Sequence, residues 1–223
     1  EITELIRFLR GCGVTIEASP GAILVQGRDT LSGCTHTVLP DRIEAATYLA
    51  AGAVTGGAVT VKCEPGHLAA PIAVLRRMGC KIKITGGSVA LTAPETLCGA
   101  GSIVTLPYPG FPTDLQAVFM AAAKGYTAFT ETVFPRRWAH VEELRRMGAD
   151  ITVAGSHAML RGAALTGTAL TCTDLRAGAA VVLAALAARG ESTVTGLSHI
   201  ERGYAEFVPT LRHLGAEITI AEI

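Results

Sequence analysis

A stiff turn leads an aspartate into an apolar stretch in PGFPTDLQA, residues 109–117. Pro109, Gly110 and Pro112 constrain the backbone before Asp114, because proline fixes its own φ and pushes the preceding residue out of helical geometry. A carboxylate on so rigid an approach suits a general base, which must lie within reach of the proton it accepts. The same position suits a helix cap. Asp114 therefore has two candidate roles.

Two further aspartates, Asp41 and Asp174, also begin apolar stretches, and for them capping is the stronger interpretation. An acidic side chain at a helix N-terminus accepts hydrogen bonds from free N–H groups and meets the positive end of the helix dipole. Two spacings match the capping box, in which the cap and a residue three positions later exchange hydrogen bonds. They are Asp41-x-x-Glu44 and Thr113-x-x-Gln116.

Three arginines stand near predicted helix starts, where the dipole disfavours a cation. They are Arg137 in PRRWAH, Arg176 in TDLR and Arg202 in HIERGY. A bound phosphate or carboxylate would favour these positions, because arginine offers two parallel donors and a helix end adds free N–H groups. Solvent exposure or pairing with nearby aspartates explains Arg176 and Arg202 equally well, and it is the better explanation for Arg136.

The elements that must position these side chains recur along the chain. Four segments read alike, each ending an amphipathic helix at a glycine and then entering an alternating strand. They are FLRGCGVTI, VLRRMGCKI, ELRRMGADI and TLRHLGAEI, with Gly13, Gly79, Gly148 and Gly215 at the helix ends. Similar spacing between the glycines indicates an internal repeat.

A second recurring element is apolar nearly all round and therefore predicts a buried helix. It occurs at 41–54, 114–125 and 174–190. β-like stretches precede the helices at 35–39, 102–106 and 168–173, and others follow at 57–61, 127–133 and 192–197. The unit is strand, buried helix, strand, surface helix and two strands, in three copies that begin near residues 33, 101 and 167.

We therefore predict an α/β fold of three repeated β-α-β-α-β-β units, with the apolar helices inside and four-stranded sheets outside, about a pseudo-threefold axis. Residues 1–30 contain only the later part of a unit and form a separate helix–strand–strand piece. Residues 31–223 form the three-unit domain, whose last strand, 216–221, ends the third unit.

Composition excludes several classes of partner. The 223 residues carry 19 basic and 19 acidic side chains, so no basic excess indicates nucleic acid or a membrane surface. The longest apolar run, 177–188, is shorter than the roughly 20 residues that a membrane span needs. The six cysteines are scattered and form no CxxC pair, which predicts reduced thiols. The sequence also has no HExxH motif or comparable spacing, so we expect no metal site. We expect a cytoplasmic protein and a fragment of a longer one, since neither a signal peptide nor an initial Met is present.

Five motifs in order resemble the UDP-N-acetylglucosamine enolpyruvyl transferases: LPDRIEAATYLAAGAVTGG, PYPGFPTDLQA, TETVFPRRWAHVEELRRMGADI, TDLRAGAAVVLAAL and HIERGY. The resemblance covers essentially the whole chain. The related 5-enolpyruvylshikimate-3-phosphate synthases share the fold, but FPTDLQA and TETVF look like the aminosugar enzymes.

The resemblance implies two inside-out α/β domains with substrates in the cleft between them, and no cofactor. It implies transfer of the enolpyruvyl group of phosphoenolpyruvate to the 3′-hydroxyl of UDP-N-acetylglucosamine, with release of phosphate, in peptidoglycan synthesis. It also assigns roles: Asp114 as the base, Val133 at the nucleotide-sugar, Arg137 in the cleft, Arg176 and Arg202 near the phosphoenolpyruvate anion, and Asp41 and Asp174 as acidic cleft residues.

The chain departs from the family by lacking its N-terminal half, which carries the Lys-Asn pair and the cysteine acid. The resemblance therefore implies that this chain is inactive alone and that the missing half is its partner. Strand 216–221 would then stay partly unpaired, or recruit ILVQG (23–27) or another copy of the chain. Two alternatives stay open: a non-catalytic binding or structural module, and a shikimate-pathway relative.

Overall fold

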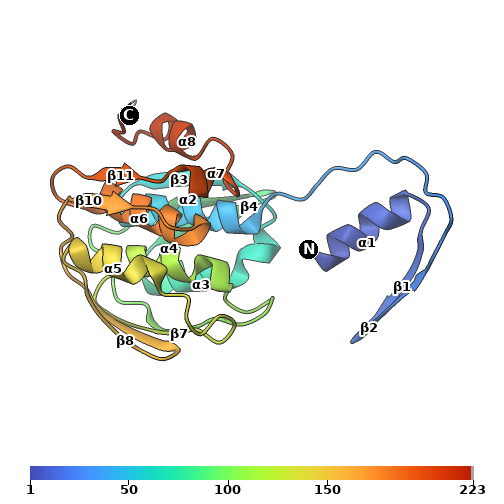
Figure 1. The fold of residues 1–223 in the computed structure, drawn as a ribbon, viewed down its shortest axis with the longest axis horizontal. Coiled ribbons are helices and arrows are strands. Elements are labelled where there is room, and N and C mark those ends of the chain that lie inside the picture. The colour runs from blue at the N-terminus through green and yellow to red at the C-terminus, as the bar shows by residue number, and fades with distance from the viewer. Residues whose placement is uncertain (222–223) are drawn as a thin grey trace. The chain divides into compact units, whose positions relative to one another are not determined.

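The computed structural model describes residues 1–221, and their contacts form two compact units, Glu1–Pro40 and a larger one from Asp41 on. The first unit consists of helix α1 (Ile2–Gly11) and an antiparallel hairpin of β1 (Thr15–Ser19) and β2 (Ala22–Gln26) (Figure 1). Residues 23–26 of ILVQG thus lie in β2 and pair with β1, and recruitment of this segment by strand 216–221 stays a prediction.

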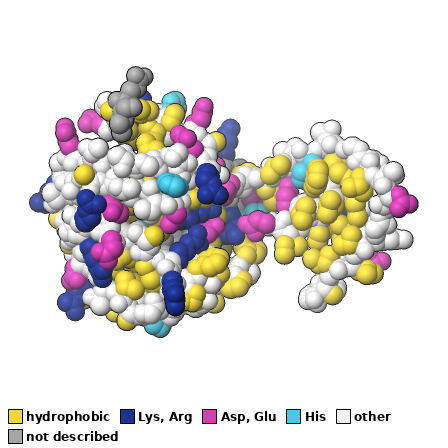
Figure 2. Space-filling view, viewed as in Figure 1, with side chains coloured by type: hydrophobic (Ala, Val, Ile, Leu, Met, Phe, Trp, Pro, Cys, Tyr) yellow, Lys and Arg dark blue, Asp and Glu magenta, His cyan; other side chains and the backbone are white. Residues whose placement is uncertain are grey.

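The first unit exposes much of its apolar surface. Helix α1 is amphipathic, yet none of its residues is buried. Figure 2 shows hydrophobic side chains gathered on this unit. Its exposed large hydrophobic residues on α1 and β2 are Ile2, Leu5, Phe8, Ile23, Leu24 and Val25. So small a unit buries too little apolar surface to be stable by that means alone.

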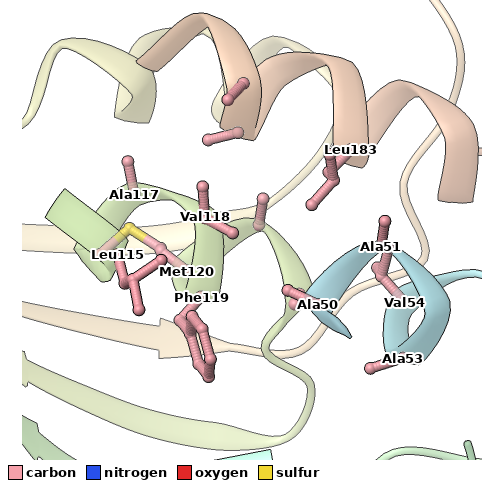
Figure 3. Packing of buried hydrophobic residues seen from close by; sticks show 14 of the residues in the cluster. Ala50, Ala51, Ala53, Val54, Leu115, Ala117, Val118, Phe119, Met120 and Leu183 are labelled. Atoms are coloured by element: carbon pink, nitrogen blue, oxygen red, sulfur yellow. The ribbon is translucent and has the colours of Figure 1, made fainter. Parts of the chain in front are cut away.

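Three buried helices form the centre of the second unit: α2 (Arg42–Val54), α4 (Gln116–Ala122) and α6 (Leu175–Ala187). They coincide with the three segments predicted to be buried, and each contacts the other two. Every residue of α4 is buried, and its side chains pack against α2 and α6 (Figure 3). Because these helices have no polar face, the fold must enclose them.

Glycine permits the closest approaches to the buried helices. A Cβ atom on Gly52 of α2 would lie 2.6 Å from Val59 Cγ1 on β3 (Ala58–Lys62). A Cβ atom on Gly178 of α6 would lie 2.8 Å from Ile200 Cγ1 on α7 (Ser198–Glu201). Side chains at these positions would push the outer elements away from the core.

The outer strands form three sheets of different size. The orders are β3-β5-β4, antiparallel; β6-β7-β9-β8, in which only β6 and β7 are parallel; and a parallel β10-β11 pair. The strands not yet given are β4 (Lys81–Thr85), β5 (Ser88–Thr92), β6 (Gly101–Val104), β7 (Tyr126–Thr130), β8 (Asp150–Ala154), β9 (His157–Arg161), β10 (Ala169–Thr171) and β11 (Thr193–Thr195). In residues 1–221, only the middle copy thus has the predicted four-stranded sheet.

The strands predicted at 35–39 and 216–221 are the ones that the smaller sheets lack. Their alternating patterns suit a strand, but a pattern cannot provide the neighbour that a hydrogen-bond ladder needs. In the first segment, Leu39 N instead donates to the Glu4 carboxylate. In the second, Ile218 O accepts from Arg212 Nε. Residues 222 and 223, which follow this predicted strand, lie outside the described range.

The surface helices of the second unit are α3 (Ala69–Arg77), which follows the 3-10 turn η1 (Pro65–Leu68), α5 (Ala139–Arg146) and α8 (Phe207–His213). The four repeat glycines that follow α1, α3, α5 and α8 have φ values from 92° to 100°, as predicted for helix ends. An arginine also recurs: Arg10, Arg145 and Arg212 each donate to the carbonyl six residues later, at Ile16, Ile151 and Ile218. The end of each of these helices is thus joined in the same way to the segment that follows it, which is a strand after α1 and α5 but not after α8.

All six cysteines are free thiols, and Cys12 Sγ lies 3.3 Å from Cys34 Sγ within the first unit. In the described part of the chain, no helix is long and apolar enough to cross a membrane.

Side-chain caps begin two of the three buried helices. Asp41 accepts hydrogen bonds from the N–H groups of Ile43 and Glu44, and Asp174 accepts from those of Arg176 and Ala177.

The third helix differs, and the capping box predicted at Thr113-x-x-Gln116 is wrong. A 3-10 turn, η2 (Thr113–Leu115), precedes α4, and no side chain caps either element. The Thr113 hydroxyl donates to Glu131 instead, and the buried Gln116 amide has no hydrogen-bond partner among residues 1–221.

Removing a cap should cost stability at α2 and α6. We expect Asp41→Ala or Asp174→Ala to lower the free energy of unfolding by about 1 kcal/mol, because two helix N–H groups lose their acceptor. Asp41→Asn and Asp174→Asn keep an acceptor oxygen and should cost less. Urea denaturation at pH 7 measures all four variants, and equal losses for Ala and Asn at either site would contradict the capping role there.

A buried histidine should make the fold sensitive to acid. Burial lowers the pKa of His140 to about 4 from 6.5, because the enclosed imidazole cannot be solvated when charged. Between these values the unfolded chain binds a proton that the folded chain does not, so stability falls as the pH falls. We expect this residue to lower the free energy of unfolding by about 2 kcal/mol from pH 7 to pH 5.

Urea denaturation at both pH values tests this expectation. His140→Leu should lose the destabilisation, whereas the exposed His213→Gln should keep it. The same pH dependence in all three proteins would show that His140 is not its source.

Candidate functional site

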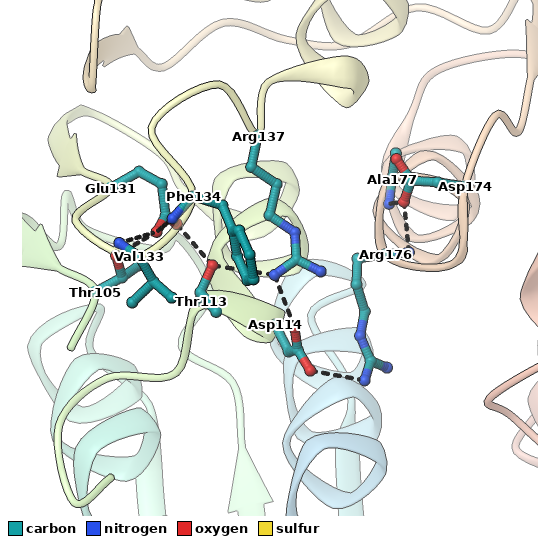
Figure 4. Close-up of polar contacts among 10 residues, drawn as sticks. All are labelled: Thr105, Thr113, Asp114, Glu131, Val133, Phe134, Arg137, Asp174, Arg176 and Ala177. Atoms are coloured by element: carbon teal, nitrogen blue, oxygen red, sulfur yellow. Dashed lines mark hydrogen bonds and ion pairs between the residues drawn. The ribbon is translucent and has the colours of Figure 1, made fainter. Parts of the chain in front are cut away.

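The Asp114 carboxylate lies between two arginines from different elements. Its Oδ1 atom is 2.7 Å from Arg137 Nη1 and its Oδ2 atom is 2.9 Å from Arg176 Nη2 (Figure 4). Asp114 belongs to η2, Arg137 precedes α5 and Arg176 is in the first turn of α6. The fold thus brings together residues 23 and 62 positions apart.

This cluster is accessible but partly shielded. The exposed fractions of the side chains are 35% for Asp114, 26% for Arg137 and 14% for Arg176. Burial raises the pKa of Asp114, but the hydrogen bond from Arg137 and the charge of Arg176 outweigh it, so the pKa lies below its ordinary value. A carboxylate next to two guanidinium groups can bind an anionic ligand through the arginines and exchange a proton through the carboxylate.

Arg176 is held on its other side by a buried tyrosine. Its guanidinium carbon lies 5.6 Å from the centre of the Tyr204 ring, and the Tyr204 hydroxyl lies 2.9 Å from Thr47 Oγ1 on α2. Burial lowers the pKa of Arg176, but Tyr204 and Asp114 outweigh this effect and raise it. The contacts join α2, α6 and the segment after α7, so Arg176 is oriented by the core.

Arg137 is held through a buried glutamate. Arg137 Nη1 donates to Thr113 Oγ1 at 3.0 Å, and the Thr113 hydroxyl donates to Glu131 Oε2 at 2.9 Å. Glu131 Oε1 accepts from Thr105 Oγ1 and from the N–H groups of Val133 and Phe134. Figure 4 shows these hydrogen bonds as a connected group from Thr105, which follows β6, to the loop before α5.

The other predicted site residues lie outside the Asp114 cluster. Val133 is 38% exposed, and only its backbone joins the network through Glu131. Arg202 is exposed and forms no ion pair within residues 1–221; it follows α7, so its predicted position near a helix start is wrong. Helix α7 has only four residues and ends before the arginine, a boundary that the apolar pattern could not predict. Asp41 and Asp174 are engaged as caps.

Sequence reasoning missed Glu131 and the role of Thr113. The available signal was a glutamate inside the β-branched and aromatic segment TAFTETVF, where a charged side chain interrupts a strand-like pattern. Tyr204 follows a predicted helix start and could line a cleft, but its 1% exposure supports packing, the commoner role. No group of three or more His, Cys, Asp or Glu in the described part of the chain could hold a metal ion.

Three bacterial relatives called UDP-N-acetylglucosamine 1-carboxyvinyltransferase match nearly the whole chain. The relative from Finegoldia magna is 46% identical over 100% of this chain and 54% of its own length. Those from Gloeobacter violaceus and Synechocystis sp. are 43% and 44% identical, over 98% and 100% of this chain and 49% and 52% of their own lengths. The chain therefore spans about half the length of the curated relatives it matches, and the resemblance expected from its motifs is confirmed.

Solved structures agree with this result. The enolpyruvyl transferase NikO from Streptomyces tendae superposes with a TM-score of 0.85 at 29% identity, over 97% of this chain and 53% of that one. EPSP synthase from Acinetobacter baumannii gives a TM-score of 0.74 at 21% identity, over 97% of this chain and 55% of that one, and shows the shared fold only.

A family model settles the classification. The model described as EPSP synthase (3-phosphoshikimate 1-carboxyvinyltransferase) matches residues 1–211. This chain therefore belongs to the EPSP synthase (3-phosphoshikimate 1-carboxyvinyltransferase) family.

Proposed function

We propose that this chain is one half of a cytoplasmic enolpyruvyl transferase. The complete enzyme moves the enolpyruvyl group of phosphoenolpyruvate to the 3′-hydroxyl of UDP-N-acetylglucosamine and releases phosphate. The observation that carries the proposal is the Asp114 carboxylate between Arg137 and Arg176, which combines a proton acceptor with two anion ligands. The names of relatives 43–46% identical to this chain support the aminosugar as the acceptor.

The residues divide the reaction between them. The oxygen of the attacking hydroxyl forms a bond to C2 of phosphoenolpyruvate, Asp114 accepts the hydroxyl proton, and C3 takes up a proton from the acid of the missing half. Loss of phosphate and of a C3 proton from this tetrahedral intermediate then restores the double bond. Arg137, Arg176 and Arg202 bind the carboxylate and phosphate of phosphoenolpyruvate, and they stabilise the phosphate when its C–O bond breaks. The Val133 side chain contacts the nucleotide-sugar. Asp41 and Asp174 lie at the edge of the site, where their caps keep the first turns of α2 and α6 in place.

Asp114 is a weak base while both arginines hold it. The two guanidinium groups keep its pKa below the ordinary value, so the carboxylate has little tendency to take a proton. An anionic substrate that draws Arg176 away would remove part of this stabilisation, while Arg137 stays in place and keeps the carboxylate oriented. Anion binding would then raise the basicity of Asp114 when the acceptor hydroxyl is present.

A non-catalytic binding or structural module is the second candidate. The ion pairs of Asp114 with Arg137 and Arg176 also support this candidate, because a carboxylate that both guanidinium groups neutralise could serve only to orient the arginines. A binding module and a catalyst would both hold an anion, but only a catalyst would release phosphate.

The proposal also gives the first unit a place in the complete enzyme. Its exposed apolar face on α1 and β2 would pack against the rest of the transferase, as part of a second inside-out domain to which residues 1–30 belong. Residues from 31 on would form the other inside-out domain, with α2, α4 and α6 at its centre. The substrates would occupy a cleft between the two.

Activity should depend on the missing half. We expect no phosphate release when this chain alone receives both substrates, because it holds only some of the required ligands. Adding the part of the Finegoldia magna relative outside the matched region should restore release, measured with a coupled phosphate assay. Turnover by this chain alone would contradict the half-enzyme proposal, and a stable but inactive complex would favour the binding module.

The shikimate alternative has a separate test in the same restored enzyme. Phosphate release with shikimate 3-phosphate in place of the aminosugar would support that alternative.

Loss of the base should affect turnover in the restored enzyme. We expect Asp114→Asn to lower kcat by about 10²- to 10⁴-fold, because the amide keeps the shape of the side chain but cannot accept the hydroxyl proton. Asp150→Asn, at an exposed position on β8, is the matched control and should change little. Near-normal kcat in a folded Asp114→Asn enzyme would show that Asp114 is not the base and has a structural role instead.

A further inference from the structure

Glu131 is a fully buried acidic side chain with no cation paired to it. It is 0% exposed, and among the described residues no ion pair includes it. Burying a carboxylate is costly unless hydrogen bonds replace its hydration. Four donors do so here, from Thr105, Thr113, Val133 and Phe134, at distances of 2.8 to 3.0 Å.

The two carboxylate oxygens of Glu131 have separate partners. Oε1 accepts from Thr105 Oγ1 and from the N–H groups of Val133 and Phe134, so it holds the loop after β7. Oε2 accepts from Thr113 Oγ1, the residue immediately before Asp114. One side chain thus connects the loop to the turn that carries the proposed base.

The Thr113 hydroxyl links Glu131 to Arg137. A hydroxyl has one proton, and that proton is committed to Glu131 Oε2, so the oxygen presents a lone pair to Arg137 Nη1 at 3.0 Å. The same Nη1 atom donates to Asp114 Oδ1 at 2.7 Å. The ring of Phe134, whose N–H group Glu131 also holds, lies 5.2 Å from the Arg137 guanidinium carbon. Glu131 therefore restrains Arg137 along two routes.

We propose that Glu131 is a positioning residue that, through the Thr113 hydroxyl, holds Arg137 against Asp114. The same carboxylate fixes the backbone of Val133, so the base and the loop beside it keep one relative geometry. The consequence for catalysis rests on the proposed function, whereas the hydrogen-bonded relay does not. A group that only stabilised the loop would have no effect on Asp114 through Thr113.

Glu131→Gln and Thr113→Val separate the relay from the loop. In Glu131→Gln, Oε1 can keep its three donors, but the amide NH₂ group replaces Oε2 and can no longer accept the Thr113 proton. Thr113→Val removes the hydroxyl at nearly constant volume and leaves Glu131 in place. Thr113→Ser restores the hydroxyl and should behave like the unmodified chain. Glu142→Gln, at an exposed position on α5, is the matched control for the loss of a carboxylate.

The readout is the pKa of the Asp114 carboxyl, followed by ¹³C NMR on the chain labelled at aspartate, without substrates. We expect Glu131→Gln and Thr113→Val each to raise it, because Arg137 is held less firmly against the carboxylate. The double variant should raise it no further than Thr113→Val alone. Additive effects of the two changes, or an unchanged pKa in folded Glu131→Gln, would overturn the proposal. If Glu131→Gln does not fold, an unchanged pKa in Thr113→Val would overturn it equally.

Turnover in the restored enzyme adds a second readout. We expect Thr113→Val and Glu131→Gln to lower kcat by about 10- to 100-fold with a smaller change in KM, because a displaced base affects the chemical step. A change in KM alone would contradict positioning of the base. If the unmodified restored enzyme is inactive, the proposed function fails, and the NMR result still decides whether Glu131 acts on Asp114.

Discussion

Three helices with no polar face impose the main constraint on this fold. Helices α2, α4 and α6 can be stable only where other elements exclude water from all sides, so the sheets and surface helices must surround them. Their small residues let them approach closely, and Gly52 and Gly178 allow the outer elements to touch them. Enclosing the three helices also places Asp114 of η2 next to Arg176 in the first turn of α6.

The polar cluster is stable at this position because every charge in it has partners. Asp114 is shared by two guanidinium groups, Arg176 lies over Tyr204, and the buried Glu131 accepts four hydrogen bonds. A partly satisfied network would be less stable than an apolar core at the same place. The complete set of partners therefore gives the site a defined geometry before any substrate binds.

Particular residues show where prediction from sequence succeeds and where it fails. The buried helices and the glycines after the surface helices were predicted correctly, because both depend on local patterns that few structures satisfy. The capping box at Thr113 was wrong, because a partner 18 residues away competes for its hydroxyl. The strands at 35–39 and 216–221 were wrong for a related reason: a strand exists only where a neighbour completes its ladder.

By itself the sequence determined which segments must be buried, where surface helices end and which family the motifs resemble. These properties follow from side-chain polarity and backbone freedom, which act over a few residues. Only the tertiary structure decided which of three aspartates at helix starts meets the arginines. Asp41 and Asp174 accept hydrogen bonds from their own helices, whereas Asp114, on a 3-10 turn, pairs with groups 23 and 62 residues away. Such contacts depend on how distant elements pack, and no local pattern records them.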